Sequence, residues 1–67
     1  MVTNTAFLRK KMYEKRLTQL ELAKLTNTSP SMIGAVIRGT RTPSYSLAQR
    51  MATALECEME DILTYVP

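Results

Sequence analysis

Histidine is absent from the sequence, and cysteine occurs only once, at Cys57. A single cysteine cannot form a disulfide within one chain, so we interpret Cys57 as a small apolar residue of a reduced, cytoplasmic protein. The sequence also lacks a glycine-rich phosphate loop, paired carboxylates and any cluster of metal-ligating residues, which argues against an enzyme and predicts neither a cofactor nor a metal site. No apolar run is long enough to cross a membrane, and the first residues lack the apolar block of a signal peptide. Because these features are absent, we expect the protein to act by binding a partner.

The 67 residues are enough for one domain, residues 1–67, and an apolar content of 45% supports one small core. The net charge is +3, which is compatible with a polyanionic partner. The basic residues gather in the first third of the chain and around Gly39: Arg9, Lys10, Lys11, Lys15, Arg16, Lys24, Arg38 and Arg41. Four of the six acidic residues lie near the other end: Glu56, Glu58, Glu60 and Asp61. A nucleic-acid-binding surface is therefore expected away from the C-terminal segment.

Helix signals recur along the chain, whereas no segment shows the alternation or the hairpin turn that is typical of β-strands. Residues 5–15 place Leu8 and Met12 on one helical face. A second helix begins at the capping box 18-TQLE-21 and ends near Asn27, a residue that tolerates the left-handed conformation of a helix C-terminus. We expect its apolar face to comprise Leu22, Ala23 and Leu25.

Three further helices follow the same logic. Ser29 as N-cap and Pro30 at the first helical position begin the third, which ends at Gly39. Ser44 caps a fourth helix with an apolar face of Leu47, Met51, Ala52 and Leu55. A short fifth helix is expected over residues 59–64, with Met59, Ile62 and Leu63 facing inward. The sequence thus predicts an all-α fold of five short helices around one core, in which the second and third form a closely joined pair.

The segment 17-LTQLELAKLTNTSPSMIGAVIRGTRTPS-44 resembles the DNA-binding domain of the lambda-repressor-like family, which includes Cro, CI and XRE-type regulators. In that family a Leu-Thr-Gln opening leads to a serine-capped recognition helix that ends in Arg-Gly and is followed by an Arg-x-Pro-Ser loop. The resemblance continues through 47-LAQRMATALECEMEDIL-63, and it implies a helix-turn-helix. Met12 and Ile37 replace an Arg–Glu pair that is frequent in the family, and we expect these two apolar side chains to pack on each other.

The helix 30–37 is expected to enter the DNA major groove. Ile33, Val36 and Ile37 share its inward face. The resemblance and the helical spacing place the candidate base contacts on the other face, at Pro30, Ser31, Met32, Gly34 and Ala35. None of these side chains makes a bidentate bond to a base, so we predict modest direct readout supplemented by DNA shape.

Phosphate contacts are expected to supply most of the affinity. The candidates lie at the start of the second helix, at the two ends of the third helix, in the loop after it and on the first helix: Gln19, Ser29, Arg38, Thr40, Arg41, Thr42, Lys10 and Lys11. For each lysine, a solvated surface charge is an equally good interpretation.

Without an effector domain, such a protein is expected to be a sequence-specific transcriptional regulator of the phage or mobile-element Cro type, a repressor or switch protein. It would bind paired half-sites of double-stranded operator DNA as a homodimer, with no small-molecule effector. The candidate dimer surface is C-terminal, at Met59, Tyr65 and Val66, although these residues could instead complete the core. An antitoxin or restriction-control regulator with the same fold is the alternative, and a helix-turn-helix that binds protein rather than DNA is a third possibility.

Overall fold

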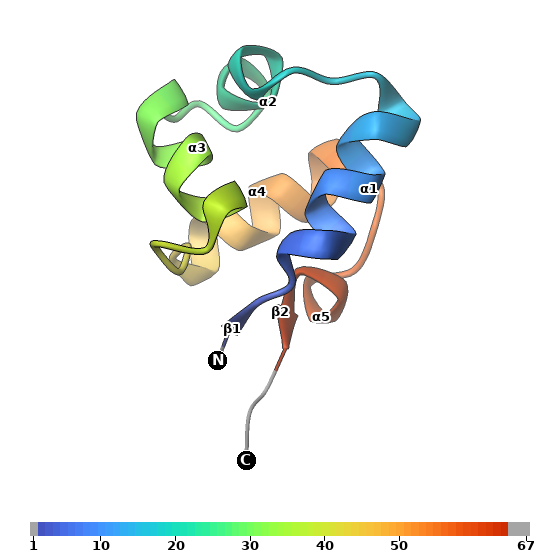
Figure 1. Cartoon of the computed structure of the whole chain (residues 1–67), viewed down its shortest axis with the longest axis vertical. Coiled ribbons are helices and arrows are strands. Elements are labelled where there is room, and N and C mark those ends of the chain that lie inside the picture. Colours follow the sequence, from blue (N-terminus) through green and yellow to red (C-terminus); the bar gives the residue numbers. More distant parts are fainter. Residues whose placement is uncertain (1, 65–67) are drawn as a thin grey trace.

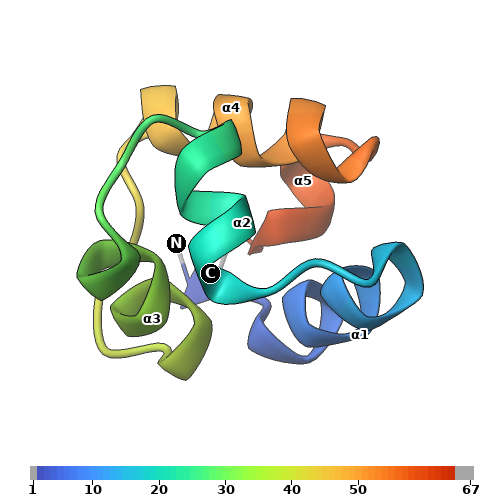
Figure 2. The same ribbon diagram turned by 90° about the horizontal axis from the view of Figure 1, so that it is seen from above.

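Five helices and one pair of short strands form the described part of the chain, residues 2–64 of this computed structural model (Figure 1). The helices are α1 (Thr5–Lys15), α2 (Gln19–Leu25), α3 (Pro30–Arg38), α4 (Tyr45–Leu55) and α5 (Met59–Ile62). Seen from above, α1 and α3 lie on one side of the molecule, α4 and α5 lie on the other, and α2 lies over the middle (Figure 2). The predicted all-α fold with five helices is confirmed.

Side-chain caps fix the starts of α2, α3 and α4 where the sequence predicted them. Thr18 accepts a hydrogen bond from the backbone N–H of Glu21 (3.1 Å), and its own N–H donates to the Glu21 carboxylate (3.0 Å), which completes the capping box. Hydrogen bonding from Thr18 holds the pKa of the Glu21 carboxyl below its usual value; the Thr18 backbone N–H is the larger cause and the Thr18 side chain is the second. Likewise, the hydroxyl groups of Ser29 and Ser44 each accept a hydrogen bond from the backbone N–H of the third residue of their helix. Gly39 ends α3 in the left-handed conformation (φ 82°).

Replacing Thr18 with alanine is expected to lower the free energy of unfolding by about 1 kcal/mol, because the backbone N–H of Glu21 loses the side-chain oxygen that accepts its hydrogen bond. Thermal and urea unfolding measure this change. Thr53→Ala is the matched control, since Thr53 lies exposed within α4 and caps no helix. Equal stabilities of the Thr18→Ala variant and the wild type would contradict the role of the cap.

A short two-stranded sheet contradicts the expectation that the chain forms no strand. β1 (Val2–Thr3) pairs antiparallel with β2 (Leu63–Thr64), with Val2 opposite Thr64. Next to this pair, the N–H of Asn4 donates to the carbonyl of Ile62 (2.8 Å). Strands of two residues are too short to show alternation, and the pairing joins opposite ends of the chain, so sequence periodicity could not reveal it. The fifth helix consequently ends at Ile62 and not at residue 64.

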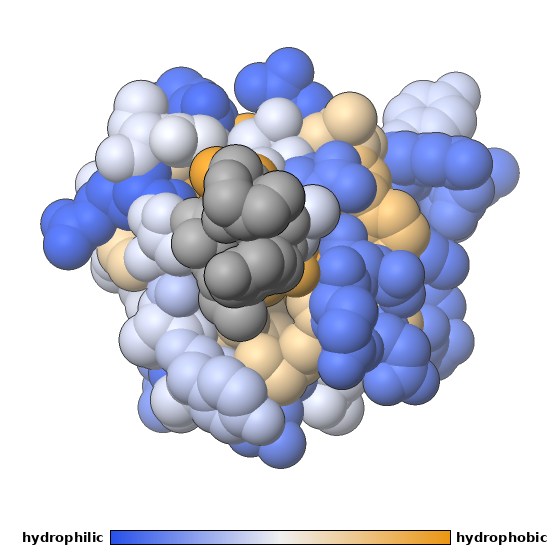
Figure 3. Space-filling view, turned by 90° about the horizontal axis from the view of Figure 1, so that it is seen from below, coloured by the Kyte–Doolittle hydropathy of each residue, from blue (hydrophilic) through white to orange (hydrophobic). Residues whose placement is uncertain are grey.

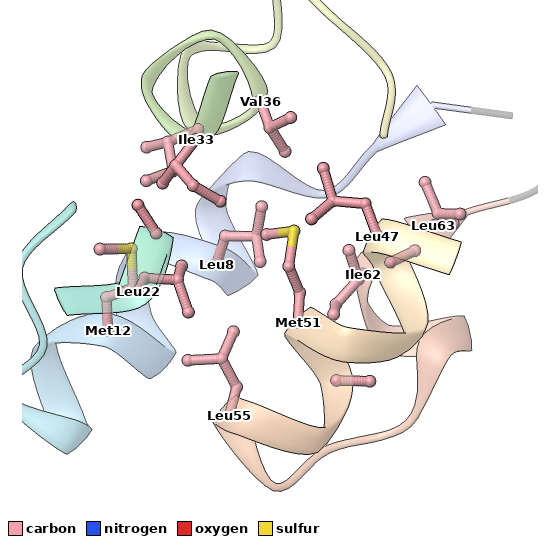
Figure 4. Packing of buried hydrophobic residues seen from close by; sticks show 14 residues of the cluster. Leu8, Met12, Leu22, Ile33, Val36, Leu47, Met51, Leu55, Ile62 and Leu63 are labelled. Carbon is pink, nitrogen blue, oxygen red and sulfur yellow. The ribbon is translucent and has the colours of Figure 1, made fainter. Parts of the chain in front are cut away.

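The core lies between the helices and contains the predicted apolar residues of α1, α3 and α4. Its largest fully buried apolar side chains are Leu8, Leu22, Ile33, Val36, Met51, Leu55 and Ile62. Figure 4 shows Met51 reaching from α4 toward Leu8. Met12 and Ile37, which we expected to pack on each other, are both buried in this cluster. The apolar replacement of the family's ion pair therefore extends the core.

Leu25 does not belong to the core, although the sequence placed it on the apolar face of the second helix. Its side chain is 60% exposed, whereas Thr26, a polar residue, is completely buried. The Thr26 hydroxyl donates to the carbonyl of Leu22 at 2.7 Å, so its polar group is satisfied inside the protein. Leu22, Ala23 and Thr26 thus form the inward side of this short helix, and Leu25 points outward.

Candidate nucleic-acid interface

The turn between α2 and α3 is held by hydrogen bonds that fix how the two helices meet. Asn27 adopts the left-handed conformation (φ 54°) that the sequence predicted for the end of the second helix. The N–H of Thr28 donates to the carbonyl of Ala23 (2.9 Å). From α4, the guanidinium of Arg50 donates to the carbonyl of Thr26 (2.9 Å). The orientation of α3 is therefore set both by the turn and by the core-forming helix behind it.

The first turn of α3 presents its side chains to solvent. Pro30 and Ser31 are exposed and Met32 is half-buried. Ser29 is exposed too, and its hydroxyl oxygen accepts the N–H of Met32 (3.1 Å), which leaves the hydroxyl hydrogen free to donate to another group. All four residues are at least partly accessible to solvent, and their contacts with DNA stay a prediction.

Gly34 and Ala35, by contrast, are buried, which corrects the expectation that they lie open on the outward face of the helix as base contacts. The carbonyl of Ala35 accepts hydrogen bonds from the N–H and the hydroxyl of Thr40 (3.0 and 3.1 Å), so the loop after α3 folds back on this turn. Gly34 is covered in another way: a Cβ atom there would lie 3.0 Å from Nη1 of Arg38 and 3.1 Å from Oε1 of Gln19. The returning loop therefore covers Ala35, and long polar side chains cover Gly34. The spacing of residues in the sequence cannot show either kind of cover.

Gln19 and Arg38 meet at the edge of a shallow hollow between α1, α2 and α3. In Figure 2 the start of α2 points toward the space between α1 and α3, which is where this hollow lies. The lining residues are Arg9, Met12, Tyr13, Leu17, Gln19, Ile37 and Arg38. Two arginines and one glutamine thus border a single depression beside α3, and the rest of its lining is largely apolar. Guanidinium and amide groups are the kinds of group that bind a phosphate.

The loop after α3 adds exposed polar groups that follow Arg38 in the chain. Thr40, Arg41 and Thr42 are all exposed. The Arg41 N–H donates to the carbonyl of Ala35 (3.3 Å), so the backbone of the loop is tied to α3 while the Arg41 side chain stays accessible. The hydroxyl of Thr40 already donates to that carbonyl, which leaves its oxygen as an acceptor and makes it a poor phosphate donor.

The cations of α1 divide between two sides of the helix. Lys11 pairs with Glu14 (3.7 Å) and lies near enough to Glu56 to help lower the pKa of that carboxylate. The main cause of the lowered Glu56 pKa is Lys15, whose ammonium hydrogen-bonds the carboxylate at 2.5 Å. Lys11 therefore faces the turn between α4 and α5, away from α3, which argues against its expected phosphate contact. Lys10 is exposed and stays a candidate.

Arg9 is the cation of α1 that sequence analysis missed as a candidate. It lines the hollow together with Gln19 and Arg38. The signal was present, because Arg9 and Tyr13 lie three residues before and one residue after Met12, which was predicted to face Ile37 of the third helix. Residues that flank an inward contact on a helix border the neighbouring helix, so the expected contact between Met12 and Ile37 already placed Arg9 next to α3.

The lower face of the molecule, around the paired strands, carries several accessible apolar groups. Val2 is 50% exposed, Tyr45 is 72% exposed, and Met59 is half-buried. Figure 3 shows apolar residues surfacing on this face beside hydrophilic ones. Met59 is therefore available for the predicted dimer contact, while Tyr65 and Val66 lie outside the described residues.

Within residues 2–64, three further features concern other kinds of site. No group of three or more potential metal-ligating side chains occurs there. Burial is the main cause that raises the pKa of the Cys57 thiol, which keeps it protonated and agrees with a structural role. Within the same range, no helix combines the length and apolarity that crossing a bilayer would need.

Comparison with known proteins points to the same segment of the chain. Residues 8–62 match a family model described as helix-turn-helix. Among solved structures, the chain is similar to the restriction-modification controller protein C.AhdI from Aeromonas hydrophila. The two share 35% sequence identity and a TM-score of 0.78, over 85% of this chain and 86% of that chain. No curated protein matches the sequence.

Proposed function

Because the chain belongs to the helix-turn-helix family of XRE and Cro/CI-like DNA-binding regulators, we propose that it controls transcription in the cytoplasm by occupying operator DNA as a homodimer. The observation that carries this proposal is the exposed first turn of α3 beside a hollow bordered by Arg9, Gln19 and Arg38. A protruding helix start can reach base edges in the major groove while the flanking cations hold the DNA backbone.

In this proposal, contacts with the phosphates of the DNA backbone supply most of the binding affinity. Gln19 stands at the first position of α2, where free backbone N–H groups and the helix dipole favour an anion. Arg38 and Arg9 approach the same hollow from α3 and α1, and Arg41 extends the cationic border along the loop. Each neutralised phosphate releases counterions, so binding weakens steeply with salt.

Few side chains of the protein are placed to recognise the base sequence of the DNA. The Ser31 hydroxyl can donate to or accept from a base edge, and Pro30 and Met32 can contact thymine methyl groups. Gly34 and Ala35 are covered, so we no longer assign them base contacts. With no bidentate side chain in the first turn, the shape and deformability of the DNA contribute part of the specificity.

Dimerisation would use the lower face, with Met59 in the contact and Val2 and Tyr45 beside it. A dimer with two-fold symmetry places two copies of α3 in successive major grooves, with half-sites about 34 Å apart. The likeness to a restriction-modification controller protein favours the restriction-control alternative over the phage switch that the sequence first indicated.

Titration of the protein against DNA from upstream of its own gene and against unrelated DNA, each at two salt concentrations, tests the proposal. We expect tight, salt-sensitive binding to the upstream DNA, with two chains per site. Footprinting across the neighbouring genes then distinguishes a restriction controller, whose sites lie beside endonuclease or methyltransferase genes, from a phage switch. If neither DNA is bound at low salt, the protein is not a DNA-binding regulator on its own, and the protein-binding alternative takes precedence.

A further inference from the structure

Gly34 occupies a helix interior where its backbone has no need of glycine. It lies in the middle of α3, and within the described residues the glycine with positive φ is Gly39. Glycine in a helix interior is the least favourable residue after proline. The position therefore carries a cost for folding, and the backbone conformation does not explain it.

The side chains that lie over Gly34 explain why glycine occupies this position. The three atoms nearest to the position of its missing Cβ are Nη1 and Cζ of Arg38, at 3.0 and 3.8 Å, and Oε1 of Gln19, at 3.1 Å. None of them belongs to the core. Both Arg38 and Gln19 are exposed residues from different helices, and their polar ends converge on the space that a side chain at position 34 would fill.

This convergence arranges hydrogen-bond donors. The amide oxygen of Gln19 and Nη1 of Arg38 lie 3.1 and 3.0 Å from the position of the missing Cβ, so both polar ends border the same small space. With its oxygen beside Gly34, the Gln19 amide keeps its N–H groups for another acceptor, and the Arg38 guanidinium has further N–H groups of its own. Donors from α2 and α3 are thus gathered into one cluster at the hollow.

We propose that Gly34 is a positioning residue. Because it has no side chain, it leaves a notch on α3 in which the polar ends of Arg38 and Gln19 lie side by side, so that together they bind one DNA phosphate. This inference rests on the proposed function. It explains the glycine at position 34 by the notch and not by a direct contact with a base. A Cβ at position 34 would lie closer to both polar ends than ordinary contact allows, so each end must shift by a few tenths of an ångström, which flexible side chains can do without disturbing the core.

The Gly34→Ala variant is therefore expected to gain stability while it loses affinity. Its Tm should rise by about 2–8 °C, because alanine favours the helix. Its affinity for the operator should fall about 3- to 10-fold, as for partial loss of a charge-assisted hydrogen bond. Thr53→Ala on α4, which also raises helix propensity, is the control and should leave affinity unchanged. An unchanged affinity and salt dependence in Gly34→Ala would overturn the proposal.

Combination with Gln19→Ala and Arg38→Ala separates this mechanism from close approach of the backbone to DNA. In the Gln19→Ala/Arg38→Ala background, Gly34→Ala should cost no further affinity, because the side chains that it displaces are gone. A loss as large as in the wild-type background would mean that the added methyl group meets the DNA itself, which contradicts the notch.

A measurement without DNA keeps the inference independent of the proposed function. In NMR spectra of the free protein, Gly34→Ala should shift the Gln19 side-chain amide and the Arg38 Nε–H signals well beyond those of the other glutamine and arginine side chains. Unchanged Gln19 and Arg38 signals would overturn the notch. A wild-type protein that binds no DNA would overturn the proposed function, while these spectra would still decide whether Gly34 positions the two side chains.

Discussion

Replacing Arg9 and Arg38 together with alanine is expected to weaken operator binding roughly 100-fold at moderate salt. Both guanidinium groups border the hollow between α1, α2 and α3, where we propose that a backbone phosphate lies. A hydrogen bond to a charged group contributes about 1.5–3 kcal/mol, so each arginine accounts for about tenfold or more. Because fewer counterions are released, the slope of log K against log salt should also fall by about two. Fluorescence anisotropy titrations over a range of salt concentrations measure both changes.

The double variant Lys11→Ala/Lys15→Ala is the matched control, since it removes the same two positive charges from the chain. These lysines belong to the side of α1 that faces Glu56, and exposed ion pairs of this kind contribute little to stability. We expect its affinity to change only a few-fold, through the lower net charge. Equal losses in the two double variants would mean that binding follows total charge, and that the hollow is no specific phosphate site.

Replacing Leu22 with alanine is expected to lower the free energy of unfolding by about 2–5 kcal/mol. Leu22 is completely buried, and its removal leaves a cavity within a small, single core. A domain of this length has a total stability of only about 3–10 kcal/mol. The variant should therefore be partly or largely unfolded at 37 °C, as circular dichroism and urea unfolding would reveal.

Leu25→Ala is the matched control, because it makes the same chemical change on the same helix. The Leu25 side chain is 60% exposed and lies outside the core, so its truncation should cost less than about 1 kcal/mol. Comparable losses for the two variants would contradict the placement of Leu25, and would restore the apolar face that the sequence alone indicated.

Local chemistry explains why the helices could be predicted so closely. Thr18, Ser29 and Ser44 each satisfy an amide three residues ahead, and Gly39 takes a left-handed conformation where its helix ends. These interactions span a few residues, so the sequence of each segment is sufficient to specify them. The candidate contacts at the first turn of α3 came instead from the resemblance to the family together with helical spacing.

Features that depend on distant segments were missed or misplaced. The pairing of β1 with β2 joins residues at the two ends of the chain, and no local pattern encodes it. The cover over Gly34 comes from Gln19 on another helix, and the choice between Arg9 and Lys11 depends on which neighbours flank α1. In each case the deciding interaction is tertiary, whereas helical periodicity reports only which residues share a face.

The strand pair also determines how the molecule can be attached to other things. Val2 lies opposite Thr64, and both are at the end of the molecule remote from α2 (Figure 1). A fluorescent protein, a surface anchor or a linker to a second copy, fused before or after the chain, therefore connects to two neighbouring residues of the described structure. Such a fusion leaves the start of α2 and the hollow beside it open to solvent, but it adjoins the face that we propose for the dimer, so a linker to a second copy suits this place better than a bulky group.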